Sequence, residues 1–205
     1  IKATHLIGAD ITYTSMGGGL YKVELTFYRD CQGSPAPFGV GINFVSANCR
    51  KQFTDTLPRE FGTGAEITYP CSGTVTSCMS SSSSVPGIQE YRYSKMITFP
   101  ARCNDWVISW SYCCRNCDIT TLNTPRPCTS GSNPGMFVTA MLNNLDAENS
   151  SPHFTNVPIT FVCLGQDFIF NHGVVDSDGD SLVYELVDPL SAQNTPVPYL
   201  PGYSA

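Results

Sequence analysis

Hydrophobic and polar residues alternate along most of this chain with a period of two. Between residues 21 and 27 every odd position is hydrophobic, whereas positions 22, 24 and 26 carry Lys, Glu and Thr. Such alternation predicts half-buried β-strands, and no segment of ten or more residues shows the 3.6-residue period of a helix. The same pattern predicts strands whose shared faces carry Tyr21, Val23, Leu25 and Phe27; Val40, Ile42 and Phe44; Tyr91, Tyr93, Ile97 and Phe99, interrupted at Lys95; Phe137, Thr139 and Met141; Ile159, Phe161 and Cys163; Phe168 and Phe170; and Leu182, Tyr184 and Leu186.

The strongest strand signal lies between residues 101 and 117, where four cysteines surround both tryptophans of the chain. Trp106, Ile108, Trp110 and Tyr112 fall on one face, and Val107, Ser109 and Ser111 fall on the other. Exposed tryptophans would offer a platform for stacking sugars, whereas buried ones would belong to the core. A strand with cysteines at both ends favours the core.

Turn-forming residues separate these strands. Glycine and proline gather at residues 17–19, 34–37, 86–87, 125–127 and 133–135. The run of serines from Ser80 to Ser84 predicts an exposed loop tip, and residues 120–135 predict a long surface loop. Together these patterns predict an all-β protein, most simply a β-sandwich.

A polar, turn-rich stretch at residues 143–158 predicts a domain boundary. We expect a disulfide-stapled β-sandwich over residues 1–150 and a second, incomplete Ig- or cadherin-like β module over residues 151–205. That module holds only three predicted strands, fewer than the roughly seven of an Ig-like sandwich. The expectation is that the natural chain continues beyond Ala205, or that another chain supplies the missing strands by strand addition.

Composition indicates an extracellular compartment. Charged residues make up 14% of the 205 residues, below the roughly 25% of typical soluble domains. The net charge of -6 argues against nucleic acid or anionic lipid as a partner. No apolar run is long enough to predict membrane insertion, and the start at Ile1 resembles a mature terminus after signal removal.

Ten irregularly spaced cysteines predict disulfides rather than zinc sites, which usually show paired C-x2-C knuckles. Around Cys113, Cys114 and Cys117, a zinc site and a redox dithiol are the alternatives to disulfides. Because adjacent residues of a strand point to opposite faces, Cys113 and Cys114 are expected to have different partners. Short loops favour Cys71–Cys78 and Cys117–Cys128. The disulfide candidates are Cys31, Cys49, Cys71, Cys78, Cys103, Cys113, Cys114, Cys117, Cys128 and Cys163.

The sharpest candidate for chemistry is the run from Asp176 to Tyr184, with aspartates at positions 176, 178 and 180. Three carboxylates at alternate positions suit Ca²⁺, a hard cation that prefers oxygen ligands. The metal candidates are therefore Asp176, Asp178 and Asp180, with Glu185 and Asp188 as further ligands. The motif lacks the glycine and glutamate positions of an EF-hand loop, and the alternative is an Asp-Gly turn with solvated carboxylates.

Catalytic candidates are few. The histidines His5, His153 and His172 lie near no nucleophile motif, and neither G-x-S-x-G nor H-E-x-x-H occurs. We therefore expect no enzymatic activity. Asn149 begins an N-glycosylation-type sequon, Asn-Ser-Ser.

Residues 9–13, 21–31 and 103–116 resemble the N-terminal region of large secreted surface proteins of Bacteroidota. The resemblance implies chains of β-sandwich modules that end in a gliding-motility-type sorting domain, which is not present here, and export by type IX secretion. Residues 171–184 also resemble cadherin-like and Ig-like repeats, in which such aspartates bind calcium. The family implies adhesin, filament or surface-layer roles rather than an active site.

These expectations describe an extracellular structural or adhesive protein, stabilised by disulfides and Ca²⁺. Its partners would be further copies of itself or other surface proteins, and glycans. The alternatives are a carbohydrate-binding module that uses exposed aromatic residues, and a secreted hydrolase or metal enzyme.

Overall fold

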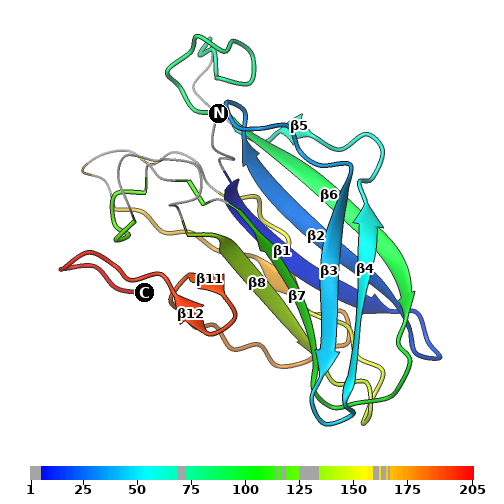
Figure 1. The fold of residues 1–205 in the computed structure, drawn as a ribbon. Helices are drawn as coiled ribbons and strands as arrows, with labels where there is room; N and C mark the ends of the chain where they lie inside the picture. Colours follow the sequence, from blue (N-terminus) through cyan, green and yellow to red (C-terminus); the bar gives the residue numbers. More distant parts are fainter. Residues whose placement is uncertain are drawn as a thin grey trace.

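The protein is an all-β sandwich in the computed structural model, which describes residues 6–68, 73–113, 115–116, 119–124, 134–158, 162, 165 and 167–205 (Figure 1). Within these residues there is no helix. The strands are β1 (Leu6–Ser15), β2 (Leu20–Asp30), β3 (Gly39–Ser46), β4 (Lys51–Pro58), β5 (Ala65–Glu66), β6 (Ile88–Thr98), β7 (Trp106–Tyr112), β8 (Met136–Leu142), β9 (His153–Phe154), β10 (Val174–Val175), β11 (Leu190–Ala192) and β12 (Thr195–Pro196).

One layer is a four-stranded sheet in the order β1-β2-β6-β5. The β1–β2 hairpin turns through Gly17, Gly18 and Gly19, all of which have positive φ, a conformation that glycine adopts at little cost. Strand β2 pairs with β6 along its whole length, from Leu20 opposite Thr98 to Asp30 opposite Ile88. This long antiparallel pairing makes β2 the central strand of the layer.

The other layer is a six-stranded sheet in the order β12-β11-β8-β7-β3-β4. Strand β7, which carries both tryptophans, lies between β3 and β8 and is therefore a central strand of this sheet. A crossover therefore places β7 beside β3 rather than beside β6, the strand that precedes it in the chain.

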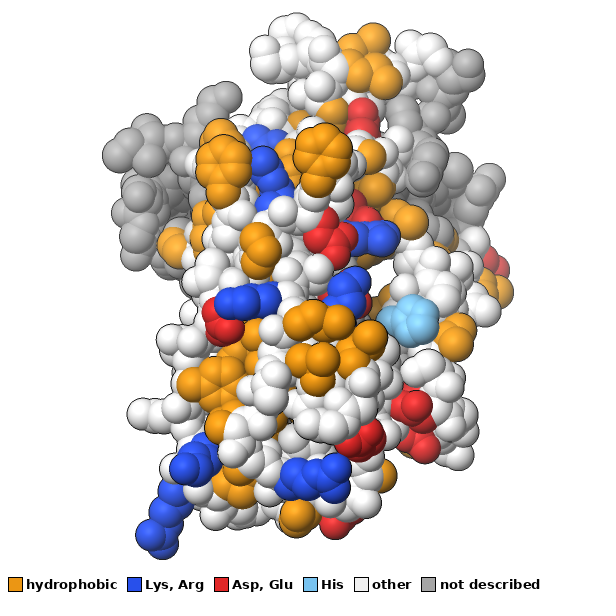
Figure 2. All heavy atoms as spheres, turned by 90° about the vertical axis from the view of Figure 1, so that its right-hand side faces the viewer, with side chains coloured by type: hydrophobic (Ala, Val, Ile, Leu, Met, Phe, Trp, Pro, Cys, Tyr) orange, Lys and Arg blue, Asp and Glu red, His pale blue; other side chains and the backbone are white. Residues whose placement is uncertain are grey.

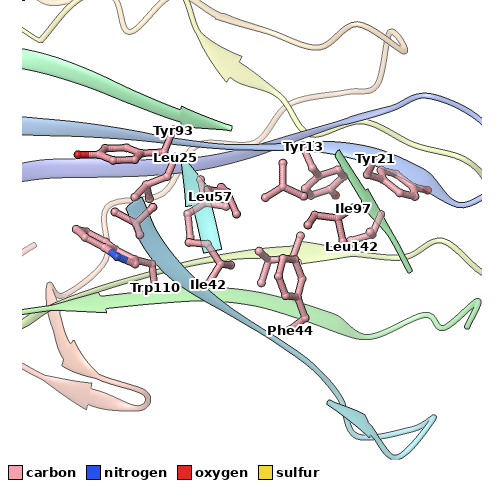
Figure 3. Close-up of a cluster of buried hydrophobic side chains, with 14 of the residues drawn as sticks. Tyr13, Tyr21, Leu25, Ile42, Phe44, Leu57, Tyr93, Ile97, Trp110 and Leu142 are labelled. Atoms are coloured by element: carbon pink, nitrogen blue, oxygen red, sulfur yellow. The ribbon is translucent and has the colours of Figure 1, made fainter. Parts of the chain in front are cut away.

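The core lies between the two layers and is rich in aromatic rings (Figure 3). Trp106 is 0% exposed and Trp110 is 2% exposed, so the prediction that both belong to the core is confirmed. Phe27 from the four-stranded sheet meets Trp110 edge-on, with ring centroids 5.9 Å apart, and Phe99 meets Trp106 at 5.1 Å. Such aromatic pairs add about 0.5–1.5 kcal/mol beyond the burial of their area.

The predicted inner faces of β2, β3 and β7 are confirmed, because their alternate hydrophobic side chains are buried. Strand β6 keeps its inner face at Tyr93 and Ile97 and exposes Lys95, the residue that interrupts its alternation. The predicted inner face of β8 was wrong. Met141 is 69% exposed, whereas Met136 and Leu142 are buried. Residues of the opposite parity therefore face the core.

The C-terminal strands differ from the prediction. Residues 182–186 and 168–170 form no strand, and most side chains of the former segment are exposed. Instead, β9 and β10 pair as a small two-stranded sheet, and β11 joins the sandwich by pairing with β8 at Leu190 opposite Phe137. Residues 190–196 thus extend the six-stranded sheet, and the described residues show no second sandwich. Most of the predicted strand at residues 158–163 lies outside the described residues.

Candidate functional site

Two disulfides cross-link the loops of the sandwich. Cys31, just after β2, pairs with Cys78 in the serine-rich loop before β6, and Cys49 in the β3–β4 turn pairs with Cys103 just before β7. The Cα–Cα distances are 4.9 and 6.1 Å, within the usual range for disulfides. Each bond therefore ties a loop to a segment about 50 residues away in the sequence.

The predicted pairing of Cys71 with Cys78 was wrong, because Cys78 is bonded to Cys31. Cys113 is also disulfide-bonded, so its thiolate is not a zinc ligand. The remaining cysteine predictions, including the Cys117–Cys128 pair, lie outside the described residues. They concern Cys71, Cys114, Cys117, Cys128 and Cys163.

The aspartates of residues 176–180 act in the structure as hydrogen-bond acceptors of a turn. Oδ1 of Asp176 accepts the backbone N–H groups of Asp178 and Asp180, at 2.9 and 3.1 Å. Oδ2 of Asp178 accepts the backbone N–H of Ser150 at 2.6 Å. This bond ties the acidic turn to Ser150, which lies within the predicted domain boundary at residues 143–158.

The acidic turn does not gather three metal-binding side chains in the described structure. Within the part of the chain that the structure describes, no three His, Cys, Asp or Glu side chains lie close enough together to hold a metal. Two of the carboxylate oxygens already accept backbone N–H groups. Glu185 and Asp188 lie exposed further along the chain. Calcium binding at Asp176, Asp178 and Asp180 therefore stays a prediction.

The sequon at Asn149 is built into the fold. Ser151 is the third residue of the sequon. Its Oγ accepts a hydrogen bond from the backbone N–H of Tyr13 at 2.9 Å, and its own backbone N–H donates to the Tyr13 carbonyl at 2.8 Å. Ser150 is buried, and its Oγ accepts the backbone N–H of Ser15 at 3.2 Å. Residues 150–151 thus dock against the end of β1.

The histidines offer no assembled catalytic group in the described structure. His153 and His172 are exposed, and His172 contacts the rings of Phe154 and Phe170 edge-on. His5 lies outside the described residues.

A groove of about 380 Å³ lies on the outer face of the four-stranded sheet. Residues 151–157, here called the strap, form one wall, and outward side chains of β1, β2 and β6 form the floor. Figure 2 shows a hollow between a histidine side chain and neighbouring Lys, Arg, Asp and Glu side chains. The floor includes Asp10 and Thr12 of β1, Glu24, Thr26 and Tyr28 of β2, and Arg92 of β6.

The strand register places the floor residues in rows. Asp10 lies opposite Thr26, and Thr26 lies opposite Arg92, so an acceptor, a hydroxyl and a cation follow one another across three strands. Directly opposite side chains of neighbouring strands have Cβ atoms about 4.5–5.5 Å apart. Tyr28 and Glu90 form the next row.

Ion pairs engage part of the charge in the groove. Glu90 binds Arg92 at 2.8 Å, and Glu24 binds Lys22 at 2.7 Å. The carboxyl of Asp10 lies at the other end of the row. Burial raises its pKa, and this effect outweighs the lowering effects of the Ile11 backbone N–H and of His153. Burial, together with the charges of Glu90 and Asp10, raises the pKa of Tyr28 to about 12.

One sign of this groove is visible in the sequence. The alternation predicts that Lys22, Glu24 and Thr26 lie on the polar face of a strand, but the alternation of a single strand does not say which strands lie beside it. The groove forms because β2 pairs with β1 and β6 and because the strap passes beside their outer face.

Comparison with known proteins found no matching family model, no matching curated protein and no matching solved structure. Nowhere in the described part of the chain is there a helix of the length and apolarity needed to cross a membrane.

Proposed function

We propose that this chain is an extracellular structural and adhesive module, and not an enzyme. The observation that carries the proposal is the pair of disulfides, Cys31–Cys78 and Cys49–Cys103, across a sandwich with a dense aromatic core. Disulfides form and persist in oxidising compartments, so they are compatible with an extracellular protein. The resemblance to secreted surface proteins of Bacteroidota agrees with this role.

The cross-links suit a module that has to stay folded outside the cell. Each bond closes a loop of about 50 residues and so restricts the unfolded chain, which typically stabilises a protein by about 2–4 kcal/mol. One bond holds the four-stranded sheet at the end of β2, and the other holds the six-stranded sheet at the β3–β4 turn. Each sheet therefore has its own disulfide cross-link.

An exposed aromatic patch supports the adhesive part of the proposal. Phe38 is 85% exposed, and Phe61 is fully exposed. The guanidinium carbon of Arg59 lies 4.8 Å from the ring centre of Phe38 and 5.5 Å from that of Tyr91. Aromatic residues and arginine are enriched at the energetic centres of protein interfaces. We therefore assign self-association to this patch, defined as Phe38, Arg59 and Tyr91, together with the exposed Phe61 two residues after Arg59 in the chain.

Strand addition at β4 is a less favourable route to assembly. β4 is the long edge strand of the six-stranded sheet, but it begins with Lys51 and ends with Pro58. Its Asp55 binds Lys95 of β6. Lysine, proline and inter-sheet contacts are devices that discourage edge-to-edge pairing.

The compartment is tested by counting free thiols in the denatured protein without reductant. We expect Cys113 and the four cysteines of the Cys31–Cys78 and Cys49–Cys103 bonds to be unreactive and to become reactive after reduction. Ten reactive thiols before reduction would overturn the extracellular proposal.

Self-association is tested by sedimentation velocity at rising protein concentration, with electron microscopy of the same samples. We expect concentration-dependent oligomers that are lost in the Phe38→Ser, Phe61→Ser double variant. Met141→Ser, which removes an exposed hydrophobic side chain elsewhere, serves as the matched control and should still associate. A strictly monomeric wild-type protein at high concentration would overturn this part of the proposal.

A further inference from the structure

We propose that the groove on the outer face of β1, β2 and β6 binds an uncharged saccharide. This inference rests on the adhesive function proposed above and names its ligand. The cavity of about 380 Å³ lies within the usual range of small-molecule sites, about 300–1,000 Å³. Its floor and its strap wall come from segments that are far apart in the sequence, so only the folded chain forms it.

The floor matches the hydrogen-bonding chemistry of a sugar. Each sugar hydroxyl both donates and accepts, and neighbouring ring carbons present such groups side by side. The row Asp10, Thr26 and Arg92 offers an acceptor, a hydroxyl that does both, and a donor. The adjoining row brings Thr12 opposite Glu24, again a hydroxyl beside an acceptor. Two neighbouring rows thus present alternating partners to several hydroxyls at once.

The strap supplies the apolar part of the site. Phe154 is 54% exposed and lines the groove, together with Val157. The C–H face of a sugar ring packs well against an aromatic side chain of this kind, while its hydroxyls point to the polar floor. Small-molecule sites commonly combine an apolar wall with a few convergent polar groups.

The charges of the groove favour an uncharged ligand. Three carboxylates, those of Asp10, Glu24 and Glu90, line the groove together with one arginine. Arg92 is paired with Glu90, and Lys22 is paired with Glu24, so neither of these cations is left to bind the acid group of a uronic acid or a sulfated sugar. Burial also raises the pKa of the Asp10 carboxyl, which means that the fold keeps this group at a cost in stability. Ionisable groups retained in this way gather at functional sites.

The test uses the full oxidised chain on an array of neutral and anionic oligosaccharides, followed by calorimetric titration with the neutral sugars that bind. We expect binding to neutral sugars. Thr26→Trp, which fills the groove floor, should weaken this binding at least tenfold, and Glu24→Gln should weaken it as well. The matched controls are Thr54→Trp on exposed β4 and Glu185→Gln on the exposed C-terminal segment, and both should bind like wild type.

Circular dichroism and thermal melting confirm that each variant is folded. If Thr26→Trp fails to fold, Glu24→Gln against Glu185→Gln decides the matter. No binding to any neutral sugar, binding to anionic sugars alone, or neutral-sugar affinity that Glu24→Gln leaves unchanged would overturn the inference. Thiol counting and sedimentation report on the proposed structural role independently, so failure of the sugar site leaves those results standing.

Discussion

Removing the disulfides one pair at a time tests how the sandwich is stabilised. Replacing both cysteines of a pair with alanine avoids leaving a thiol that could form new bonds. The two bonds span 47 and 54 residues, and the chain-entropy relation gives a loss of about 4 kcal/mol for a loop of either size. Chain entropy alone therefore predicts nearly equal losses.

Packing distinguishes the two pairs. Cys103 is 1% exposed and belongs to the hydrophobic core, whereas Cys31 and Cys78 are only half-buried. Truncating a buried side chain adds a cavity cost, here about 1 kcal/mol for one sulfur atom. We expect the Cys49→Ala, Cys103→Ala variant to lose about 1 kcal/mol more than the Cys31→Ala, Cys78→Ala variant.

Guanidinium unfolding without reductant measures both losses as free energies of unfolding. Thr54→Ala, a truncation on the exposed side of β4, is the control and should change this free energy by less than about 0.5 kcal/mol. Losses below about 1 kcal/mol for both pairs would refute the loop-entropy argument. A larger loss for the Cys31–Cys78 pair would refute the argument from burial.

Three further predictions concern the groove, a turn and the acidic motif. Burial raises the folded-state pKa of Asp10 above its ordinary value of 3.8, so the folded state tolerates the protonated carboxyl better than the charged one. The free energy of unfolding is therefore higher at low pH and falls as pH rises through that raised pKa. Asp10→Asn should therefore raise the melting temperature at pH 7 and lose this advantage near pH 3; a gain independent of pH would contradict the assignment. Gly62→Ala should cost about 1 kcal/mol for its positive φ. Gly64→Ala should cost more in the same unfolding assay, because a Cβ there would lie 2.6 Å from the Tyr91 ring, and equal losses would count against the clash. Chelator should lower the melting temperature if Asp176, Asp178 and Asp180 bind calcium, and Asp176→Asn should then abolish this effect; an unchanged melting temperature would mean that Asp176 only accepts the N–H groups of its turn.

Alternation predicted the inner faces of the strands with one polar side, and it failed where both sides are apolar. In β2, lysine, glutamate and threonine mark the outward positions, so the inner face was identified correctly. In β8, Phe137 and Met141 compete with Met136, Val138 and Leu142, and a period of two does not say which set is buried. The pairing of β8 with β7 decides it, because Trp106 lies opposite Leu142.

The segment at residues 182–186 shows why alternation alone does not make a strand. Its predicted inner face carries Leu182, Tyr184 and Leu186, yet Tyr184 is 62% exposed and Leu186 is 81% exposed, and the segment has no strand partner among the described residues. A strand needs a neighbouring edge for its backbone hydrogen bonds and a surface against which to bury one face. Neither requirement is visible in a single sequence.

The disulfide pairing and the groove are not predictable from the sequence for a related reason, because both depend on which strands become neighbours. The short loop between Cys71 and Cys78 suggested a bond, but the β2–β6 pairing brings Cys31 beside the loop before β6 instead. The outward residues of β2 likewise acquire their partners only when β1 and β6 flank it.

The acidic motif and the groove meet at one short segment, residues 150–151. Asp178 accepts the N–H of Ser150, and Ser151 exchanges two hydrogen bonds with the backbone of Tyr13 in β1. The strap begins at Ser151, so the acidic turn and β1 together fix the point from which the groove wall starts. A carboxylate that accepts a backbone N–H makes a charge-assisted hydrogen bond, stronger than a neutral one. Asp178, one of the three aspartates that the sequence suggests as calcium ligands, thus has a direct structural role in the fold, because it holds the start of the groove wall.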